Sequence, residues 1–470
     1  MIDFSQRILS STIKDAVGAP AMMAGWVQSV RKMGKILFID LRDKDGITQL
    51  VVNPESAAQA TARRIRPEWV IGVRGSVKDR GEAHVNEKIA SGTVEMAVDE
   101  IEVLNEALTP PFEIDDRKDV SEEIRLQYRY LDLRHERMQK NIRMRHDIVR
   151  YMRTFLSDRD FTEIETPTLT KGTPEGAREY VVPSRLYPGN FYVLPQSPQQ
   201  FKQLLMVAGF ERYFQFARCF RDEDQRGDRQ PEFTQLDLEM SFIQQDDILA
   251  LMEELFTSLV ETLYPHKHIT KKPWPRITYA EAMKQYHTDK PDLRIHPDDP
   301  DELAFAFVTD FPLFEKTADG KLASAHHPFT MPAAEDLETF EEHPLTANSQ
   351  AYDMVLNGNE IGSGSIRIHN RDLQNRIFKT LGLPDDEIEQ RFGHMLRAFE
   401  YGAPPHGGMA PGIDRIVMLL QNEPNIREVM AFPKTGDARD LMMGAPSEIP
   451  EEQIASVHIQ TVIDDKEKKT

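Results

Sequence analysis

The chain has 470 residues, of which 40% are hydrophobic and 29% are charged, as expected for a globular protein of more than one domain. Its formal net charge of -20 argues against a general nucleic-acid binder, because contacts with phosphates require lysine and arginine. No apolar run reaches the length of about 18 residues that a membrane span needs, and the first residues lack a signal-peptide pattern. A single cysteine, Cys219, excludes an internal disulfide, so we expect a cytoplasmic protein.

Five β-like segments fill the first hundred residues. They span 21–30, 35–43, 47–52, 68–77 and 92–104, and a helix-like stretch at 54–68 lies between the third and the fourth. Five strands with a helix after the third are typical of an oligonucleotide-binding barrel (OB-fold). We therefore expect such a domain at residues 1–106.

The second of these segments, "ILFIDLRD", has two different faces. Side chains alternate along a strand, so Leu37 and Ile39 predict the core face. Phe38 then lies among polar residues, where its ring either stacks on a base or packs under a neighbouring loop, and the pattern leaves both open. On the same face, Gln49 could offer hydrogen bonds to a stacked base and Arg31 could bind a phosphate.

A hinge and a larger domain follow the barrel. Pro110 and Pro111 disfavour regular structure, and the charged stretch behind them predicts a linker at 107–135. An amphipathic helix at about 137–159 then opens the second domain, 136–470. The apolar stripe of this helix fits either the protein core or a dimer contact. The strand that follows the helix ends at Pro167.

A charged hairpin is the most unusual feature of the second domain. The segment "RDEDQRGDRQPE" lies between two strand-like segments, "FARCF" and "FTQLDLEMSF". Two buried strands would hold arginines and carboxylates rigidly, and arginine binds phosphate through paired hydrogen bonds. Phe233 is placed where a flat ring could stack on a base. The alternative is a solvated loop whose charges have no function.

Several segments together resemble a known family. "FRDE" followed by "RQPEF" resembles motif 2 of the class II aminoacyl-tRNA synthetases, "GAPPHGGMAPGIDRIVMLL" resembles motif 3, and the long helix with "FTEIETPTL" resembles motif 1, the dimerisation motif. "TPEGAREY", "AHHPFT", "YDMVLNGNEIGSGSIRIH" and "AFPKT" are similar to segments of the bacterial-type aspartyl-tRNA synthetases, and the resemblance covers about 20–450.

The resemblance implies both a fold and an activity. The fold is α+β, with an N-terminal anticodon-binding barrel and a catalytic antiparallel sheet flanked by helices, assembled as a homodimer. The activity is activation of aspartate by ATP with Mg2+, followed by transfer of the aspartyl group to tRNA(Asp). Arg31, Phe38 and Gln49 become candidate contacts with the anticodon.

Motifs 2 and 3 imply the residues that handle ATP. Arg221 would grip the α-phosphate and the substrate carboxylate, and Glu223 would fix Arg221 and the adenine. Phe233 and Arg415 would sandwich the adenine ring. Gln230, at the return of the hairpin, would contact ATP or the tRNA end. Arg221, Glu223 and Arg415 are the catalytic candidates, although an ion pair between Arg221 and either Glu223 or Asp224 is the structural alternative.

A second set of residues is implied for aspartate. Lys202 and Arg367 match the two cations that hold the side-chain carboxylate, and charges excluded from water discriminate strongly between a carboxylate and an amide. The other matches are Gln199 and Asp237 near the α-amino group, Glu175 in a closing loop, and His326 near the substrate and the γ-phosphate.

Two carboxylates are implied for Mg2+. Asp353 and Glu360 match the family's magnesium ligands, and Glu360 is implied for ATP binding as well. Magnesium prefers oxygen ligands and bridges phosphates. A carboxylate pair alone is more often solvated, but its place beside "GSGSIRIH" favours a metal site. No ligand cluster accompanies His326 and His327, so a transition metal is not expected.

The sequence departs from the family pattern in two places. The large insertion between motifs 2 and 3 is reduced to about 296–303, and the loop "RKMGKILF" differs from bacterial relatives near the third anticodon base. The second difference leaves open whether tRNA(Asn) is also a substrate. The alternatives are an asparaginyl-tRNA synthetase, against which Lys202 argues, and a non-catalytic RNA-binding paralogue, against which Arg221, Glu360 and Arg415 argue.

Overall fold

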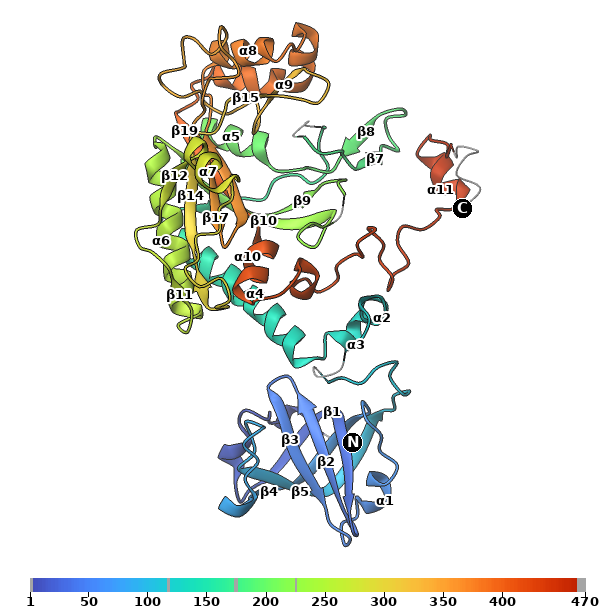
Figure 1. The fold of residues 1–470 in the computed structure, drawn as a ribbon. Helices are drawn as coiled ribbons and strands as arrows, with labels where there is room; N and C mark the ends of the chain where they lie inside the picture. The colour runs from blue at the N-terminus through green and yellow to red at the C-terminus, as the bar shows by residue number, and fades with distance from the viewer. Residues whose placement is uncertain (1–2, 116–118, 173–175, 225, 463–470) are drawn as a thin grey trace. The chain divides into compact units, whose positions relative to one another are not determined.

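The computed structural model describes residues 3–115, 119–172, 176–224 and 226–462 (Figure 1). It divides into two compact units, Met1–Ile124 and Arg125–Thr470. The finer limits expected from the sequence, with a hinge at 107–135 between the domains 1–106 and 136–470, stay predictions.

The first unit is a five-stranded barrel, as predicted. Its strands are β1 (Pro20–Met33), β2 (Ile36–Asp43), β3 (Gly46–Val52), β4 (Val70–Asp79) and β5 (Val94–Asn105), closed in the order β1-β2-β3-β5-β4. The predicted helix-like stretch forms only the short α1 (Gln59–Ala62), and 3-10 turns occupy η1 (Phe4–Gln6), η2 (Ile13–Ala16) and η3 (Glu82–His84). Closure leaves no free strand edge, which favours a stable small domain.

The second unit is built on an eight-stranded sheet. The strand order is β12-β14-β17-β18-β19-β10-β9-β6, and neighbours are antiparallel except for the two edge pairs, β12 with β14 and β6 with β9. The strands are β6 (Thr162–Glu163), β9 (Arg212–Phe220), β10 (Glu232–Ser241), β12 (Arg276–Thr278), β14 (Phe305–Thr309), β17 (Ala351–Leu356), β18 (Asn359–Ile366) and β19 (His406–Pro411).

Shorter strands pair outside the main sheet. They are β7 (Val181–Pro183) with β8 (Phe191–Val193), β11 (His268–Ile269) with β13 (Glu302–Leu303), and β15 (Phe314–Lys316) with β16 (Leu322–Ser324). The helices are α2 (Glu122–Gln127), α3 (Arg129–Asp132), α4 (Glu136–Ser157), α5 (Gln199–Val207), α6 (Gln245–Leu263), α7 (Tyr279–Tyr286), α8 (Arg371–Thr380), α9 (Asp385–Phe399), α10 (Ile413–Leu420), η4 (Ile426–Val429) and α11 (Glu451–Ser456).

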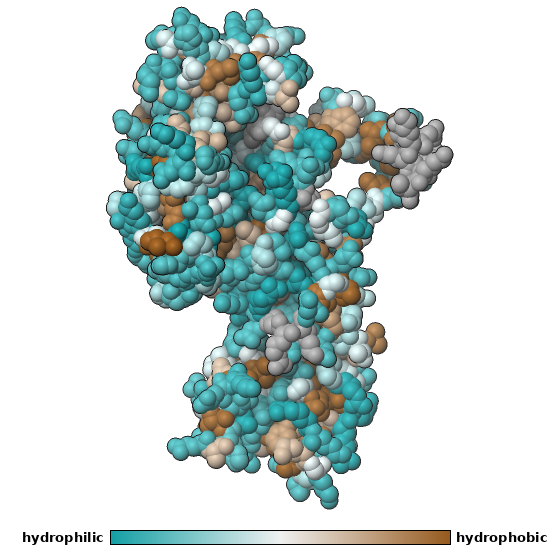
Figure 2. Space-filling model, viewed as in Figure 1, coloured by the Kyte–Doolittle hydropathy of each residue, from teal (hydrophilic) through white to brown (hydrophobic). Residues whose placement is uncertain are grey.

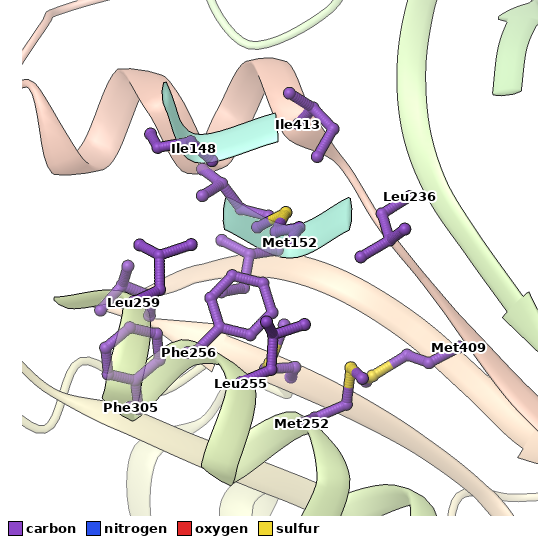
Figure 3. Packing of buried hydrophobic residues seen from close by; sticks show 14 of the residues in the cluster. Ile148, Met152, Leu236, Met252, Leu255, Phe256, Leu259, Phe305, Met409 and Ile413 are labelled. Carbon is purple, nitrogen blue, oxygen red and sulfur yellow. The ribbon is translucent and has the colours of Figure 1, made fainter. Parts of the chain in front are cut away.

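Helices α4, α6 and α10 bury one face of the sheet. Figure 3 shows Met152 of α4, Phe256 of α6 and Ile413 of α10 within the same hydrophobic cluster as Leu236 of β10. Each fully buried side chain of this kind stabilises the fold by about 1.5–3 kcal/mol. The amphipathic helix expected at 137–159 is therefore α4, and its apolar stripe serves the core.

The alternation along β10 decides which residues face away from these helices. Leu236 and Leu238 point into the core cluster, so Gln235, Asp237 and Glu239 point to the opposite face of the sheet. No helix of the described residues is long and apolar enough to cross a membrane. On the face shown in Figure 2, hydrophilic residues predominate and hydrophobic residues lie in small, separate groups.

Candidate active site

The charged hairpin forms as predicted between two paired strands. β9 and β10 run antiparallel with Phe233 opposite Cys219, and the Arg221 amide donates to the carbonyl of Pro231 at 2.9 Å, which closes the connecting loop. The charges of the loop form specific pairs. Arg229 donates to Glu223 at 2.8 Å, and Arg415 of α10 donates to Asp228 at 2.9 Å.

The hairpin cavity lies beneath this loop. Its volume is about 230 Å³, and it is lined by Arg221, Glu223, Asp228, Arg229, Gln230, Phe233, Gln235, Glu360, Ile361, Gly362, Ala410, Gly412, Asp414, Arg415 and Ile426. Every residue that the sequence implied for ATP is therefore in one place. The Arg221 guanidinium lies 5.1 Å from the centre of the Phe233 ring, a cation–π contact.

Two arginines of the hairpin cavity have unused hydrogen-bond donors. The Nε atoms of Arg221 and Arg415 are buried and lack a partner among the described residues. Among the described residues Arg221 also forms no ion pair, whereas Glu223 forms one with Arg229. A buried N–H without an acceptor is costly, so these donors fit an anionic ligand such as a phosphate.

Gln230 has a structural role in the same cavity. Its Nε2 donates to the Lys434 carbonyl at 2.9 Å, and its Oε1 accepts from the Lys434 amide at 2.7 Å. These two bonds attach the "AFPKT" segment to the hairpin. A direct contact between Gln230 and ATP stays a prediction.

The charge cavity adjoins the hairpin cavity. Its volume is about 240 Å³, and its lining residues are Ser197, Gln199, Lys202, Arg221, Gln235, Asp237, His326, His327, Glu360, Ser363, Gly364, Arg367 and Ala410. Four of them, Arg221, Gln235, Glu360 and Ala410, line both cavities. The two cavities therefore adjoin one another at these shared residues.

Three of the charges that line the charge cavity, Lys202, Asp237 and Arg367, form a buried network with Glu239, which does not line the cavity itself. Lys202 Nζ lies 2.8 Å from Asp237 Oδ1 and 3.3 Å from Glu239 Oε2, and the exposed fraction of its side chain is 2%. Arg367 Nε donates to Glu239 Oε1 at 3.0 Å. Burial of charges is costly unless they are paired, and this network pairs two cations with two carboxylates.

The two carboxylates differ in their proton affinity. Burial raises the pKa of Asp237 above its ordinary value, although the charge of Lys202 opposes the shift. Burial alone would also raise the pKa of Glu239, but the charges of Arg367 and Lys202 outweigh it and lower that pKa. Asp237 Oδ2 has no hydrogen-bond partner among the described residues. A cationic group on a ligand would satisfy it.

The histidine pair is neutral and lies against Arg367. Burial, and to a smaller extent the charge of Arg367, lower the pKa of His326 from its ordinary value of 6.5 to about 4. The same two causes hold the pKa of His327 well below its ordinary value, and its Nε2 accepts a hydrogen bond from Arg367 Nη1 at 2.6 Å.

Asp353 and Glu360 come together on neighbouring strands. In the β17–β18 pair, Asp353 is opposite Ser363 and Glu360 is opposite Val355. Burial raises the pKa of Asp353 well above its ordinary value, and the negative charge of Glu360 adds to this shift. Asp353 Oδ1 has no hydrogen-bond partner among the described residues. Such an oxygen beside a second carboxylate fits a Mg2+ ligand.

One implied residue cannot be placed, and one important residue was missed. Glu175 lies outside the described residues. Glu239, which bonds both Lys202 and Arg367, was not singled out from the sequence, although it shares strand parity with Asp237. Gly408 lies against it, since a Cβ at this glycine would come within 2.1 Å of Glu239 Oε2.

The three anticodon candidates share one outer face of the barrel. Arg31 is opposite Phe38 in the β1–β2 pair, and Gln49 is opposite Asp40 in the β2–β3 pair. Phe38 is half-buried, whereas Leu37 and Ile39 on the other face belong to the barrel core. Arg31 donates to Asp40 at 2.9 Å and to Gln49 at 3.4 Å.

Comparison with known proteins places this architecture among close relatives. An aspartate–tRNA(Asp/Asn) ligase of Rubrobacter xylanophilus is 45% identical, and the alignment covers 96% of each chain. An aspartate–tRNA ligase of Geobacillus kaustophilus is 40% identical, with 96% of this chain and 98% of the relative covered. The Rubrobacter alignment extends over 578 positions, more than the 470 residues here, so that relative contains residues without a counterpart in this chain.

A solved structure shares the fold of this chain, and two family models match parts of its sequence. The crystal structure of a putative aspartyl-tRNA synthetase from Leishmania major has a TM-score of 0.75 at 23% identity, covering 91% of this chain and 93% of the other. The model of OB-fold nucleic-acid-binding domains matches residues 22–104. The model of class II tRNA synthetases (D, K and N) matches residues 121–436, more than half of the chain. The chain is therefore a member of the class II tRNA synthetases of the D, K and N group.

Proposed function

We propose that the protein is an aspartate–tRNA ligase. The observation that carries this proposal is the pair of adjoining cavities: one has an aromatic ring and unused arginine donors, and the other has paired buried charges. The names of the most similar relatives support the same activity. The alternatives, an asparaginyl-tRNA synthetase and a non-catalytic paralogue, are not favoured.

The proposed reaction uses both of the adjoining cavities. A carboxylate oxygen of aspartate attacks the α-phosphorus of ATP, the bond to the β-phosphate oxygen breaks, and pyrophosphate leaves. The 3′-hydroxyl of the terminal adenosine of tRNA then attacks the carbonyl carbon of the adenylate, and AMP leaves. Arg221 lines both cavities, so its guanidinium is positioned to stabilise charge on the α-phosphate as the bonds exchange.

Asp353 and Glu360 would hold Mg2+, which neutralises phosphate charge when it is bound. The unpartnered oxygen of Asp353 supports this assignment. Glu360 and Arg221 line both cavities, which supports a role for the second carboxylate at the phosphates that Arg221 would contact.

The buried charges account for a choice of aspartate over asparagine. The α-ammonium would complete the hydrogen bonding of Asp237, and the side-chain carboxylate would accept from Lys202 and Arg367. The side-chain amide of asparagine would instead turn its N–H donors toward Lys202 and Arg367, or leave the donors of these two cations unpaired. Such a mismatch in a buried site costs about 2–5 kcal/mol.

The proposed partners are tRNA and a second copy of the chain. Phe38 would stack on an anticodon base, and the exposed Arg31 would exchange its pairing with Asp40 for a phosphate. The homodimer is proposed from the resemblance to motif 1. The names of the relatives include tRNA(Asp) alone and both tRNA(Asp) and tRNA(Asn), so they leave the second substrate open.

The test is charging of two transcripts, tRNA(Asp) and tRNA(Asn), with labelled aspartate and with labelled asparagine. The proposal expects aspartate on tRNA(Asp). Aspartate on tRNA(Asn) as well would define a non-discriminating enzyme, and its absence would define a strict one. Asparagine accepted in place of aspartate would overturn the assignment.

A further inference from the structure

A chain of hydrogen bonds leads from the main-chain carbonyl of the half-buried Pro404 to Gln199, which lines the charge cavity. His406 Nδ1 lies 2.8 Å from the carbonyl oxygen of Pro404, and His406 Nε2 lies 3.1 Å from the side-chain nitrogen of Gln203. Gln199 Nε2 donates to Gln203 Oε1 at 3.1 Å. All three side chains are buried, with exposed fractions of 0% for His406, 0% for Gln203 and 5% for Gln199.

The direction of each bond follows from its neighbour. A carbonyl oxygen only accepts, so His406 Nδ1 carries the proton in its bond to Pro404. In a neutral imidazole, Nε2 is then an acceptor, and the Gln203 amide must present its NH2 group to it. The Gln203 carbonyl oxygen consequently faces Gln199 and must receive an N–H from it.

The direction of these hydrogen bonds also determines the orientation of the Gln199 side-chain amide. Because the NH2 group of Gln199 is directed at Gln203, its carbonyl oxygen is the group available to the charge cavity that Gln199 lines. The opposite orientation would need a second proton on His406. Burial lowers the pKa of His406, which keeps the ring neutral near pH 7.

We propose that His406 and Gln203 are positioning residues that hold the Gln199 carbonyl oxygen toward the charge cavity as an acceptor for the α-ammonium of the amino acid. The inference rests on the proposed function, since it assigns a ligand group to that cavity. Together with the unpartnered oxygen of Asp237, this acceptor gives the ammonium two defined contacts. The Pro404 carbonyl orients His406, and Gln203 and Gln199 follow in turn, so this carbonyl contributes to the selection of a free α-amino group.

Two substitutions at one position separate positioning from packing. Gln203→Met removes the acceptor for Gln199, so we expect the KM for aspartate in ATP–pyrophosphate exchange to rise about tenfold while the KM for ATP stays within about twofold. Gln203→Glu keeps an oxygen for Gln199 and should leave the KM for aspartate near the wild-type value. A packing role predicts the reverse order, because methionine suits a buried site better than a carboxylate does.

The neighbouring Gln200 provides a matched control. It lies on the same helix, 5% exposed, and its two side-chain polar atoms have no partner among the described residues. Gln200→Met should therefore leave the KM for aspartate unchanged. If Gln203→Met behaves like Gln200→Met, the inference is wrong.

A competition assay gives a readout that does not depend on how much of a variant is folded. Succinate is aspartate without the α-amino group, so the ratio of its inhibition constant to the KM for aspartate measures recognition of the ammonium. We expect Gln203→Met to lower this ratio about tenfold. An unchanged ratio would overturn the inference even if Gln203→Glu does not fold. Wild-type protein without aspartate-dependent exchange would instead contradict the proposed function.

Discussion

The two cavities differ in how their charges are held. At the charge cavity the side chains of Lys202, Asp237 and Arg367, together with Glu239 behind them, are at most 2% exposed and pair with one another. In the hairpin cavity the side chains of Arg229 and Asp228 are 44% and 40% exposed, and they sit on a loop between two strands. The protein interior therefore fixes the charges of the first set, whereas Arg229 and Asp228 are partly exposed to solvent.

This difference in exposure indicates whether a cavity is suited to selecting an amino acid or to binding a nucleotide. Charges excluded from water interact strongly, so a wrong side chain is rejected by unpaired buried donors. Partly exposed arginines interact less strongly but can follow a triphosphate as it enters. Selectivity between amino acids should therefore depend on the charge cavity, and binding of the nucleotide on the hairpin cavity.

The largest expected effect is at Lys202. Lys202→Met leaves Asp237 and Glu239 with one cation fewer in a buried site. We expect kcat/KM for aspartate in pyrophosphate exchange to fall about a thousandfold, while the KM for ATP changes less than about threefold. An equal rise in both KM values would break the distinction between the cavities.

Removal of Arg415 should have the opposite pattern. Arg415→Ala deletes a buried donor and the contact with Asp228 in the hairpin cavity. We expect adenylate formation to slow about a hundredfold, with the ratio of kcat/KM for aspartate to that for asparagine preserved. Full activity of this variant in single-turnover experiments would show that the hairpin cavity is not the ATP site.

A smaller effect, limited to tRNA, is expected at the barrel. Phe38→Ala removes the half-buried ring on the outer face of β2. Loss of stacking should raise the KM for tRNA in charging about tenfold and leave pyrophosphate exchange unchanged. Leu186→Ala, which removes an exposed side chain in the catalytic unit, provides a comparison. If Phe38→Ala also lost pyrophosphate exchange, the Phe38 ring would be needed for the stability of the fold rather than for tRNA binding.

The smallest effect concerns pH. His326 has a pKa of about 4 in the folded protein against an ordinary value of 6.5, so the unfolded chain binds more protons between these values. Its contribution to stability is present above about pH 6.5 and is lost as the pH falls toward 4, with a slope of at most about 1.4 kcal/mol per pH unit. When the free energy of unfolding is measured in urea at several pH values, it should change less steeply with pH in His326→Gln than in the wild-type protein. An unchanged pH dependence in His326→Gln would show that His326 is not its source.

Much of the fold was predictable because strands and core helices have strong local patterns. The five barrel strands, the β9–β10 hairpin and α4 follow directly from alternation and helical periodicity. The resemblance of local motifs made Arg221 and Arg415 candidates, and both line the hairpin cavity. Glu239 was missed because its importance comes from Lys202 and Arg367, which are distant in sequence. The bonds of Gln230 to Lys434 likewise depend on tertiary contacts.

The most direct test of the account is pyrophosphate exchange by the unmodified protein with aspartate and with asparagine. Paired buried charges in the charge cavity predict that kcat/KM for aspartate exceeds that for asparagine by at least about a hundredfold. Equal values, or a preference for asparagine, would contradict the claim that Lys202 and Arg367 select a carboxylate.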